Sequence, residues 1–191
     1  MNTLVGNVVR LEPLAAHHSA ELFAVLGNDI EAWRWLLNKT PTSVDELAVI
    51  VENHLQDYAA GTREPYAVIL LASERVIGTT SFMDISNSDR AVEIGSTIYA
   101  KEFWRTAVNT ECKFLLLTEA FEVRDYLRVA LKTDFENKRS QAAITRIGGI
   151  YEGTLRSHKI RPDGSSRDTV YFSILKNEWP AVKARLQEAL A

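Results

Sequence analysis

Apolar residues are densest between positions 103 and 122, in the segment FWRTAVNTECKFLLLTEAFE. At helical spacing this segment carries Val108, Cys112, Leu116 and Ala120. Further apolar residues between them widen the stripe beyond one face, which is typical of a helix buried between a sheet and further structure. The first turn is polar instead, with the small capping residues Thr106, Asn109 and Thr110. The pattern therefore predicts a buried helix with a polar N-terminal end.

The segments on either side of this helix have the composition of strands. Residues 91–99 come directly before it, and residues 126–133 follow it and alternate apolar with polar positions. Two strands joined by a helix are expected to run parallel with a right-handed crossover, and Gly95 is compatible with a bulge in the first strand. Where strand, turn and helix meet, the free amides and the positive end of the helix dipole point outward. This layout can hold an anion.

The chain before residue 62 is predicted to be mainly helical. The expected elements are an edge strand at Val8–Glu12, a helix from His17 to Leu26 and a second helix between Ser43 and Gly61. Ser43 and Glu46 have the spacing of a capping box at the start of the second helix. The inward stripe of that helix is predicted to contain Val44, Leu47, Val51, Leu55 and Tyr58. Residues 30–38, with Trp33 and Trp35, are harder to place.

The rest of the chain alternates strand and helix patterns. The expected elements are a hairpin of Tyr66–Ala72 and Arg75–Met83, a helix from Asn137 to Ile147, a hairpin of Tyr151–Ile160 and Asp168–Leu175, and a closing helix from Pro180. This order of elements predicts an α/β protein with a mixed sheet, of the α+β kind. We expect one domain over residues 1–191, with a core at 8–175 and a closing helix at 178–191.

Composition narrows the function classes. The net charge of -3 gives no electrostatic reason to expect nucleic acid as a partner. One cysteine fits a reducing cytosol, and we find neither a signal peptide nor a membrane-spanning segment, so a cytoplasmic location without membrane partners is expected. The four histidines do not cluster with other ligands, so no metal is expected. The motifs of serine hydrolases and P-loop nucleotide hydrolases are absent.

Residues 8–175 resemble the GNAT N-acetyltransferases, in particular their ribosomal-protein N-terminal acetyltransferase (RimJ/RimL-like) branch. The resemblance depends on EIGSTIYAKEFWRTAVNTECK at 93–113, Asn137-x-x-Ser140, GGIYEGTLR at 148–156, and the spacing of Asp168, Tyr171 and Trp179. It implies the GNAT acyl-CoA N-acyltransferase fold, a mostly antiparallel sheet with one parallel pair and helices on both faces. It also implies that the parallel strands splay apart, and that the chain transfers an acetyl group from acetyl-CoA to a primary amine by direct attack.

The resemblance also assigns a cofactor site. In the family, a Gln/Arg-x-x-Gly-x-Gly/Ala loop holds the pyrophosphate of acetyl-CoA, whereas this chain has Trp104 at the first position and no glycine in the loop. Because backbone N–H groups bind the phosphates, other small residues can replace glycine there. The residues implied to bind the phosphates are Arg105, Thr106, Ala107, Val108, Asn109 and Thr110. Those implied to bind the pantetheine arm are Ile98, Tyr99 and Asn137.

Two residues are candidates for proton transfer. By resemblance, Glu93 removes a proton from the attacking amine, and its alternative is a strand residue paired with a neighbouring Arg or Lys. Ser140 or a water molecule protonates the departing thiolate, and the alternative for Ser140 is an ordinary residue in the first turn of a helix. Many family members use a tyrosine for this step, but Ile144 is at the corresponding position here. A backbone N–H near Ile98 or Tyr99 is expected to polarise the thioester carbonyl.

The sequence leaves two alternatives for the acceptor and two for the activity. The acceptor is a protein α-amine or a small-molecule amine, and an acidic cleft would favour a polyamine or an aminoglycoside. A non-catalytic acyl-CoA sensor with the same fold is the rival from another class, because the loop lacks glycine and the tyrosine is missing. Relatives in the family are often dimers, so a homodimer is a further expectation from the resemblance.

Overall fold

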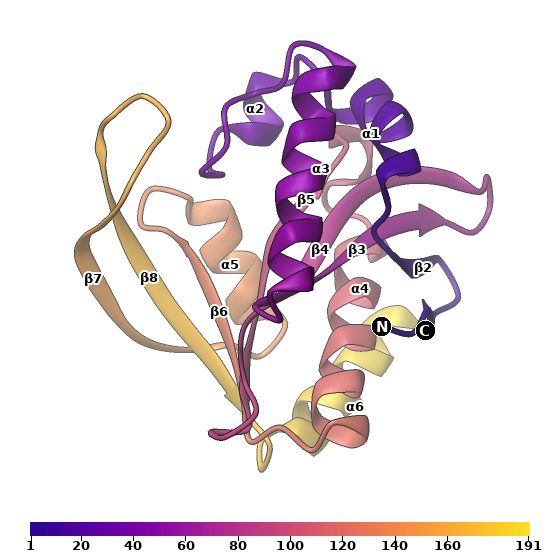
Figure 1. The fold of residues 1–191 in the computed structure, drawn as a ribbon. Helices are drawn as coiled ribbons and strands as arrows, with labels where there is room; N and C mark the ends of the chain where they lie inside the picture. The colour runs from indigo at the N-terminus through magenta and orange to yellow at the C-terminus, as the bar shows by residue number, and fades with distance from the viewer.

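One eight-stranded sheet runs through the protein, and the computed structural model describes all of residues 1–191 (Figure 1). Its order is β1-β2-β3-β4-β5-β6-β8-β7. The strands are β1 (Leu4–Val5), β2 (Val9–Pro13), β3 (Arg63–Leu70), β4 (Arg75–Ser86), β5 (Ala91–Tyr99), β6 (Arg128–Asp134), β7 (Ile150–Ile160) and β8 (Ser166–Leu175). Only β5 and β6 pair in parallel, so the predicted mixed sheet with one parallel pair is confirmed.

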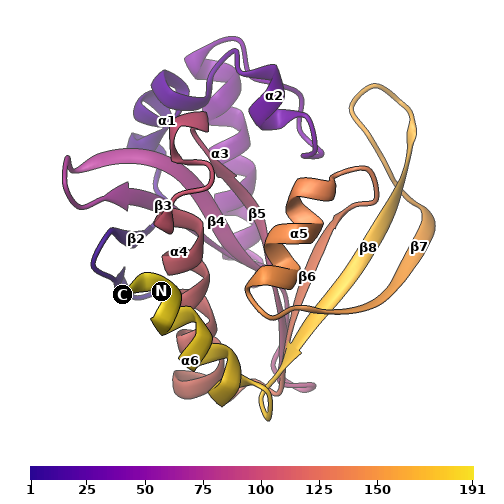
Figure 2. The same cartoon turned by 180° about the vertical axis from the view of Figure 1, so that it is seen from behind.

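Helices cover both faces of this sheet (Figures 1 and 2). One face carries α1 (Ser19–Leu26), α2 (Ile30–Trp33) and α3 (Val44–Ala59), and the other carries α4 (Ala107–Thr118), α5 (Lys138–Arg146) and α6 (Trp179–Leu190). A π-helical turn at Glu119–Val123 extends α4, and short 3-10 turns occupy Ala16–His18 and Lys101–Phe103. None of the helices combines the length and the hydropathy needed to span a bilayer.

Each face has its own apolar core. On one side the residues of α1 to α3 pack around Leu22, Trp33 and Leu47. On the other side α4 lies between the sheet and α6, with Cys112 and Leu116 fully buried. Two packing partners explain why apolar residues surround more than one side of α4, and they confirm the prediction of a helix buried between a sheet and further structure.

Several local predictions require correction. The two-residue β1 pairs outside β2, so β2 is not the edge of the sheet. Val44 and Tyr58 are 40% and 42% exposed, because they lie in the first and last turns of α3, beyond its buried residues Leu47 and Val51. Ser43 does cap α3, but the carboxylate of Glu46 accepts from Thr42 rather than from the amide of Ser43, so the capping box is incomplete.

A bulge in β5 changes which residues face which core. Ser81 of β4 lies opposite Gly95, but Thr79 lies opposite Ile98, so β5 contains one extra residue between these pairs. Ser96 in the bulge has a left-handed φ of 49°. As a result Ile98 packs in the core around α1 to α3, whereas Ile94 packs in the core around α4. Regular alternation over residues 91–99 would place Ile98 on the face of Ile94, and the bulge reverses this.

Pairing between the two parallel strands is short. It extends only from Ala91 to Glu93 on β5, opposite Arg128 to Ala130 on β6. Beyond these residues β5 continues to Tyr99 and β6 to Asp134 without a common ladder. The two strands therefore splay apart within the sheet, as the family resemblance implied.

A buried carboxylate joins the start of the chain to α4. Glu111 is 3% exposed, and its two oxygens accept from the backbone amides of Asn7, Val8 and Val9, each at 2.7 Å. These bonds are charge-assisted and link β2 to the helix that supports the splayed strands.

Replacing Glu111 by alanine is expected to destabilise the fold. Three backbone donors would lose an acceptor that water replaces only in part, so the free energy of unfolding should fall by about 2–4 kcal/mol. Urea unfolding followed by circular dichroism would measure this. Glu188→Ala, on the exposed face of α6, is the control and should change the free energy of unfolding by less than about 0.5 kcal/mol. Equal effects of the two substitutions would contradict the role of Glu111.

Candidate functional site

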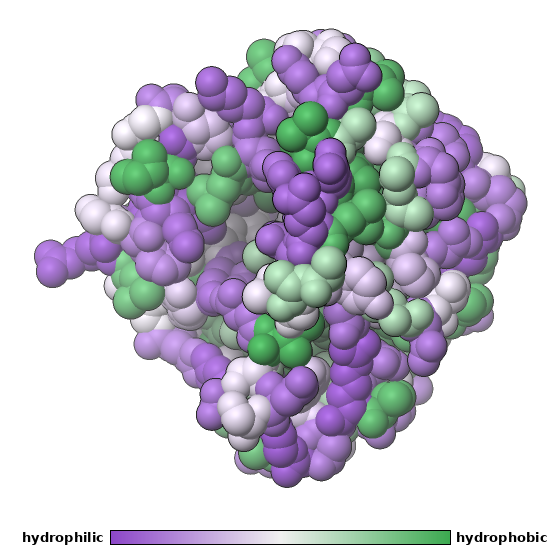
Figure 3. Space-filling view, in the orientation of Figure 1, coloured by the Kyte–Doolittle hydropathy of each residue, from purple (hydrophilic) through white to green (hydrophobic).

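The splay of β5 and β6 opens a cleft of about 1200 Å³. It extends from the N-terminal ends of α4 and α5 on one face of the sheet to α3 and the β7–β8 hairpin on the other. Figure 3 shows one mouth as a hollow between α3 and this hairpin, with mostly hydrophilic residues around it. A ligand in the cleft can therefore reach both faces of the sheet.

The first mouth is built on the start of α4. Thr106 has an extended backbone and caps the helix, because its hydroxyl accepts from the amide of Val108 at 3.3 Å and donates to the carbonyl of Phe103 at 2.8 Å. Arg105 before it has a left-handed φ of 62°. Glycine adopts this conformation most easily, so the chain makes a tight turn here without glycine. The remaining free amides of the first turn point out of the helix.

A tryptophan and an arginine join this turn to α5. The indole of Trp104 donates to the carbonyl of Tyr99 at 3.0 Å, which fixes the ring at the end of β5. The guanidinium of Arg139 lies 3.5 Å from the centre of that ring. Burial lowers the pKa of Arg139, and the nearby Arg105 lowers it further. Two cations therefore lie together at the positive end of α4.

A third cation reaches the same helix. Arg146 of α5 donates to the hydroxyl of Thr110 at 3.0 Å and lines the cleft. Neither Arg139 nor Arg146 was predicted from the sequence. The position of Arg139 between Asn137 and Ser140 was the only signal in the sequence, and the contact of Arg146 with α4 requires the fold.

Six of the predicted cofactor residues line this cleft, namely Ile98, Tyr99, Arg105, Thr106, Asn109 and Asn137. The other three do not present side chains to it. Ala107 is exposed outside the cleft, and Val108 packs in the apolar core. Thr110 is buried, and its hydroxyl accepts from Arg146. These three residues can contribute only backbone groups.

The N-terminal end of α5 forms the opposite wall. The side-chain oxygen of Asn137 accepts from the amide of Ser140 at 3.0 Å, so Asn137 caps the helix as its residue type predicted. Ser140 and Ile144 both line the cleft. A hydroxyl is thus held close to the splayed strands by a cap of its own helix.

The carboxylate of Glu93 lies where the two strands separate. Glu93 is 8% exposed, lines the cleft and forms an ion pair of 2.6 Å with Lys132 of β6. Lys132 also pairs with Asp84 at 2.7 Å. Burial raises the pKa of Glu93, and Lys132 opposes this increase. Glu93 is therefore paired with a neighbouring Lys, as the alternative expected, and it also lines the cleft.

A second buried lysine has no acidic partner. Lys113 of α4 is 6% exposed, and its ammonium donates to the hydroxyls of Thr97 at 2.7 Å and Thr80 at 3.4 Å. Burial lowers its pKa from 10.5 to about 8. It lines the cleft. It was not predicted from the sequence, because one lysine in an apolar helix forms no pattern.

The side chains around the cleft are strongly basic in balance. The lysines and arginines are Arg63, Arg105, Lys113, Lys132, Arg139, Arg146, Lys159 and Arg167. The carboxylates are Asp84 and Glu93. The field inside the cleft therefore attracts anions and disfavours ligands that carry several positive charges.

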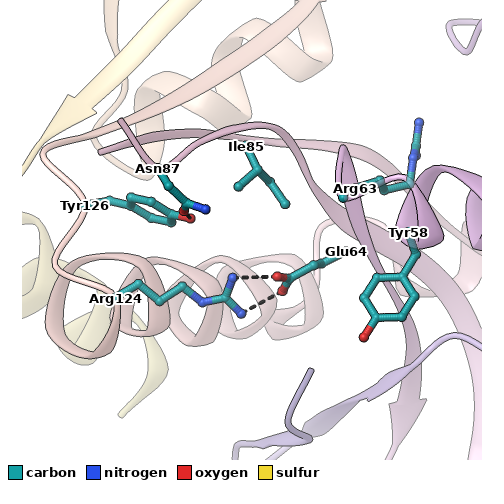
Figure 4. A pocket seen from close by; sticks show the side chains of 8 residues that line it. Tyr58, Arg63, Glu64, Ile85, Asn87, Arg124 and Tyr126 are labelled. Atoms are coloured by element: carbon teal, nitrogen blue, oxygen red, sulfur yellow. Dashed lines mark hydrogen bonds and ion pairs between the residues drawn. The ribbon is translucent and has the colours of Figure 1, made fainter. Parts of the chain in front are cut away.

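A smaller cavity of about 370 Å³ lies near the C-terminal end of α3 and differs in its charges (Figure 4). Arg124 donates two hydrogen bonds to the carboxylate of Glu64, at 2.9 and 2.7 Å, and a third to Glu119. Tyr126 donates to the side-chain oxygen of Asn87 at 3.2 Å. Since these groups are hydrogen-bonded to one another, they are not free to bind a ligand in this cavity.

Comparisons with known proteins point to one family. Residues 9–150 match the acetyltransferase (GNAT) domain. The chain is 33% identical over 180 residues to the "Putative ribosomal N-acetyltransferase YdaF" of Bacillus subtilis, which covers 91% of this chain and 92% of that protein. A GCN5-related N-acetyltransferase from Brucella melitensis is 33% identical and matches 100% of this chain and 86% of its own, with a TM-score of 0.93. Mycobacterium smegmatis RimJ, solved in complex with CoA-disulfide, shares the fold at 19% identity, with a TM-score of 0.85 over 98% of this chain and 94% of its own.

Replacing Lys113 by methionine is expected to stabilise the protein at neutral pH. A lysine with a lowered pKa destabilises the folded state fully below pH 8, less as pH rises, and not at all above its ordinary value of 10.5. Thr80 and Thr97 remain hydrogen-bonded to each other in the variant. Relative to wild type, the advantage of Lys113→Met should shrink by about 3 kcal/mol between pH 7 and pH 10.5 in urea unfolding. The exposed Lys39→Met is the control, and a difference independent of pH would contradict the assignment.

Proposed function

Because the chain belongs to the GNAT family of acetyltransferases and uses acetyl-CoA as cosubstrate, we propose that it acetylates a primary amine by direct attack of the amine on the thioester. The observation that carries this proposal is the cleft between β5 and β6. One end is a basic helix N-terminus suited to phosphates, and the other end has a buried carboxylate. The whole of residues 1–191 would act as one acetyltransferase domain.

The residues of the first mouth fit the cosubstrate. The free amides of α4 and the guanidinium groups of Arg105 and Arg139 would bind its pyrophosphate. The pantetheine arm would run along β5 at Ile98 and Tyr99, where β6 does not pair with the backbone on its side of the strand, and past Asn137. A strand edge without a partner is the surface on which an extended amide-bearing arm can form backbone hydrogen bonds.

The cosubstrate supplies the acetyl thioester, and the protein supplies the proton transfers. Glu93 would accept the proton of the attacking amine, directly or through water, since burial raises its pKa toward the range useful for a base. Ser140 would donate a proton to the departing thiolate. A backbone N–H near Ile98 or Tyr99 would stabilise the negative charge that develops on the carbonyl oxygen.

The basic cleft supports a neutral or acidic acceptor over a polycation. The lysines and arginines around the cleft outnumber the carboxylates by six. These positive charges would repel polyamines and aminoglycosides, which carry several positive charges themselves. A protein or peptide α-amine carries at most one such charge at its reacting end. The name of the Bacillus subtilis relative refers to ribosomal N-acetylation, which supports the same class of acceptor for this chain.

Binding of acetyl-CoA tests the first half of the proposal. Calorimetry should give a micromolar Kd, and Arg139→Ala should weaken binding by about 10- to 100-fold because a charge-assisted contact to phosphate is lost. Arg156→Ala, an exposed residue of β7, is the control and should leave the Kd unchanged. No binding at millimolar cosubstrate would contradict the proposal. Tight binding without an acetylated product from any amine in a panel would favour the acyl-CoA sensor.

Steady-state kinetics tests the proton transfers. Glu93→Gln and Ser140→Ala should each lower kcat by about 100-fold or more, with an unchanged Kd for acetyl-CoA, since general acid–base groups typically contribute this much. For Glu93→Gln, the acidic limb of the wild-type pH profile of kcat/KM should also disappear. If either variant retains the wild-type kcat, the residue replaced in it takes no part in proton transfer.

A further inference from the structure

A buried arginine on the second side of the cleft has no hydrogen-bond partner. Arg167 of β8 is 9% exposed and lines the cleft, and its Nε atom is fully buried without an acceptor. Its nearest carboxylate is Asp134, with an Nε to Oδ2 distance of 3.8 Å, which is beyond hydrogen-bond range. That carboxylate is already held at both oxygens by Arg161, at 2.8 and 3.0 Å.

Two neighbours of Arg167 are in the same condition. The hydroxyl of Thr169 and the Nδ1 atom of His158 are buried without partners, and both residues line the cleft. Arg167 and Thr169 are two apart on β8, so they point to the same face of the sheet. Leaving such groups unsatisfied costs free energy, which indicates that something else supplies their partners when the protein works.

The smaller cavity near α3 gives the contrast within the same molecule. There Arg124 is half-buried, and it donates hydrogen bonds to Glu64, as Figure 4 shows, and to Glu119. The guanidinium of Arg124 is thus satisfied within the protein. Arg167 is more deeply buried, faces the large cleft and has no hydrogen-bonded carboxylate.

The position of Arg167 relates it to the acceptor rather than to the phosphates of the cosubstrate. Tyr171, on the same face of β8, lies opposite Lys132 in the ladder, and Lys132 pairs with Glu93. The phosphate-binding mouth at α4 and α5 lies on the other face of the sheet. Arg167 is therefore on the side of the cleft where the proposed base is found.

We propose that Arg167, Thr169 and His158 form a subsite that binds a carboxylate carried by the acceptor close to its amine. A guanidinium matches the planar, bidentate geometry of a carboxylate, and a hydroxyl adds a third donor. The acceptor would then be either an amino acid or a peptide that begins with an acidic residue. This subsite depends on the proposed acetyl transfer, because it names the chemical class of that acceptor.

Matched acceptors test the subsite. Wild-type protein should have a kcat/KM at least about 10-fold higher for an acceptor with a carboxylate than for its carboxamide, as in peptides that begin with Asp or Asn, or in a free amino acid and its α-carboxamide. Arg167→Gln should raise KM for the carboxylate by about 10- to 100-fold, with little change in kcat or in KM for the carboxamide. Arg167→Lys should recover part of this loss. Preference between the peptide pair and the free amino acid pair identifies the source of the carboxylate.

A binding measurement keeps the result independent of turnover. The N-acetylated carboxylate product is titrated into the protein without acetyl-CoA. Wild-type protein should bind this product at least about 10-fold more tightly than Arg167→Gln does, and Arg156→Gln should bind it as tightly as wild type. The thermal midpoint of Arg167→Gln should not fall, since no internal hydrogen bond is lost. Equal use and equal binding of carboxylate and carboxamide would overturn the subsite while acetyl transfer stands. Absence of acetylation of any amine would overturn the proposed function instead.

Discussion

Pairing between β5 and β6 stops after Glu93 and Ala130, and the rest of the site depends on this interruption. A regular parallel ladder would bring the two strands about 4.8 Å apart along their whole length, and no ligand could pass between them. Instead the bulge at Ser96 turns β5 away from the regular register. The backbone of β5 beyond Glu93 then has no strand partner on its β6 side, which leaves donors and acceptors for an extended ligand.

The interruption also brings charge into the interior. Lys113 and Arg167 are buried at the cleft, and burial lowers their pKa values. Neither has a carboxylate within hydrogen-bond distance, so each destabilises the folded protein to some degree. Such local destabilisation is common where a site must bind charged groups. The two apolar cores and the bonds of Glu111 offset it from outside the site.

The two faces of the sheet present different groups to the cleft. Helices α4 and α5 present their N-terminal ends, with capping residues Thr106 and Asn137, on one face. The other face presents long side chains from β5, β6 and β8, which can reach a reacting group directly. Because the cleft runs through the sheet rather than along one face, the cosubstrate and the acceptor can approach from opposite sides and meet at the splay.

The sequence by itself determined the elements and their caps, because these depend on residues close together in the chain. Periodicity located the helix after β5, hydroxyl and amide residues located its cap and that of α5, and the motif at 93–113 located the family. Of nine cofactor-site predictions, six residues line the cleft. Ala107, Val108 and Thr110 do not, since a loop motif selects consecutive residues while a helix turns them in different directions.

The tertiary structure alone decided which faces and charges meet. The one-residue bulge reverses the alternation of β5. Gly95 is compatible with a bulge, but periodicity shows neither that the bulge forms nor which residues it turns over. Glu93 pairs with Lys132, Arg139 stacks on Trp104, and Arg167 has no hydrogen bond to its nearest carboxylate. All of these relations are between residues far apart in the chain. Their environments are set by strand register and by burial, and these quantities exist only once the sheet and its helices have assembled.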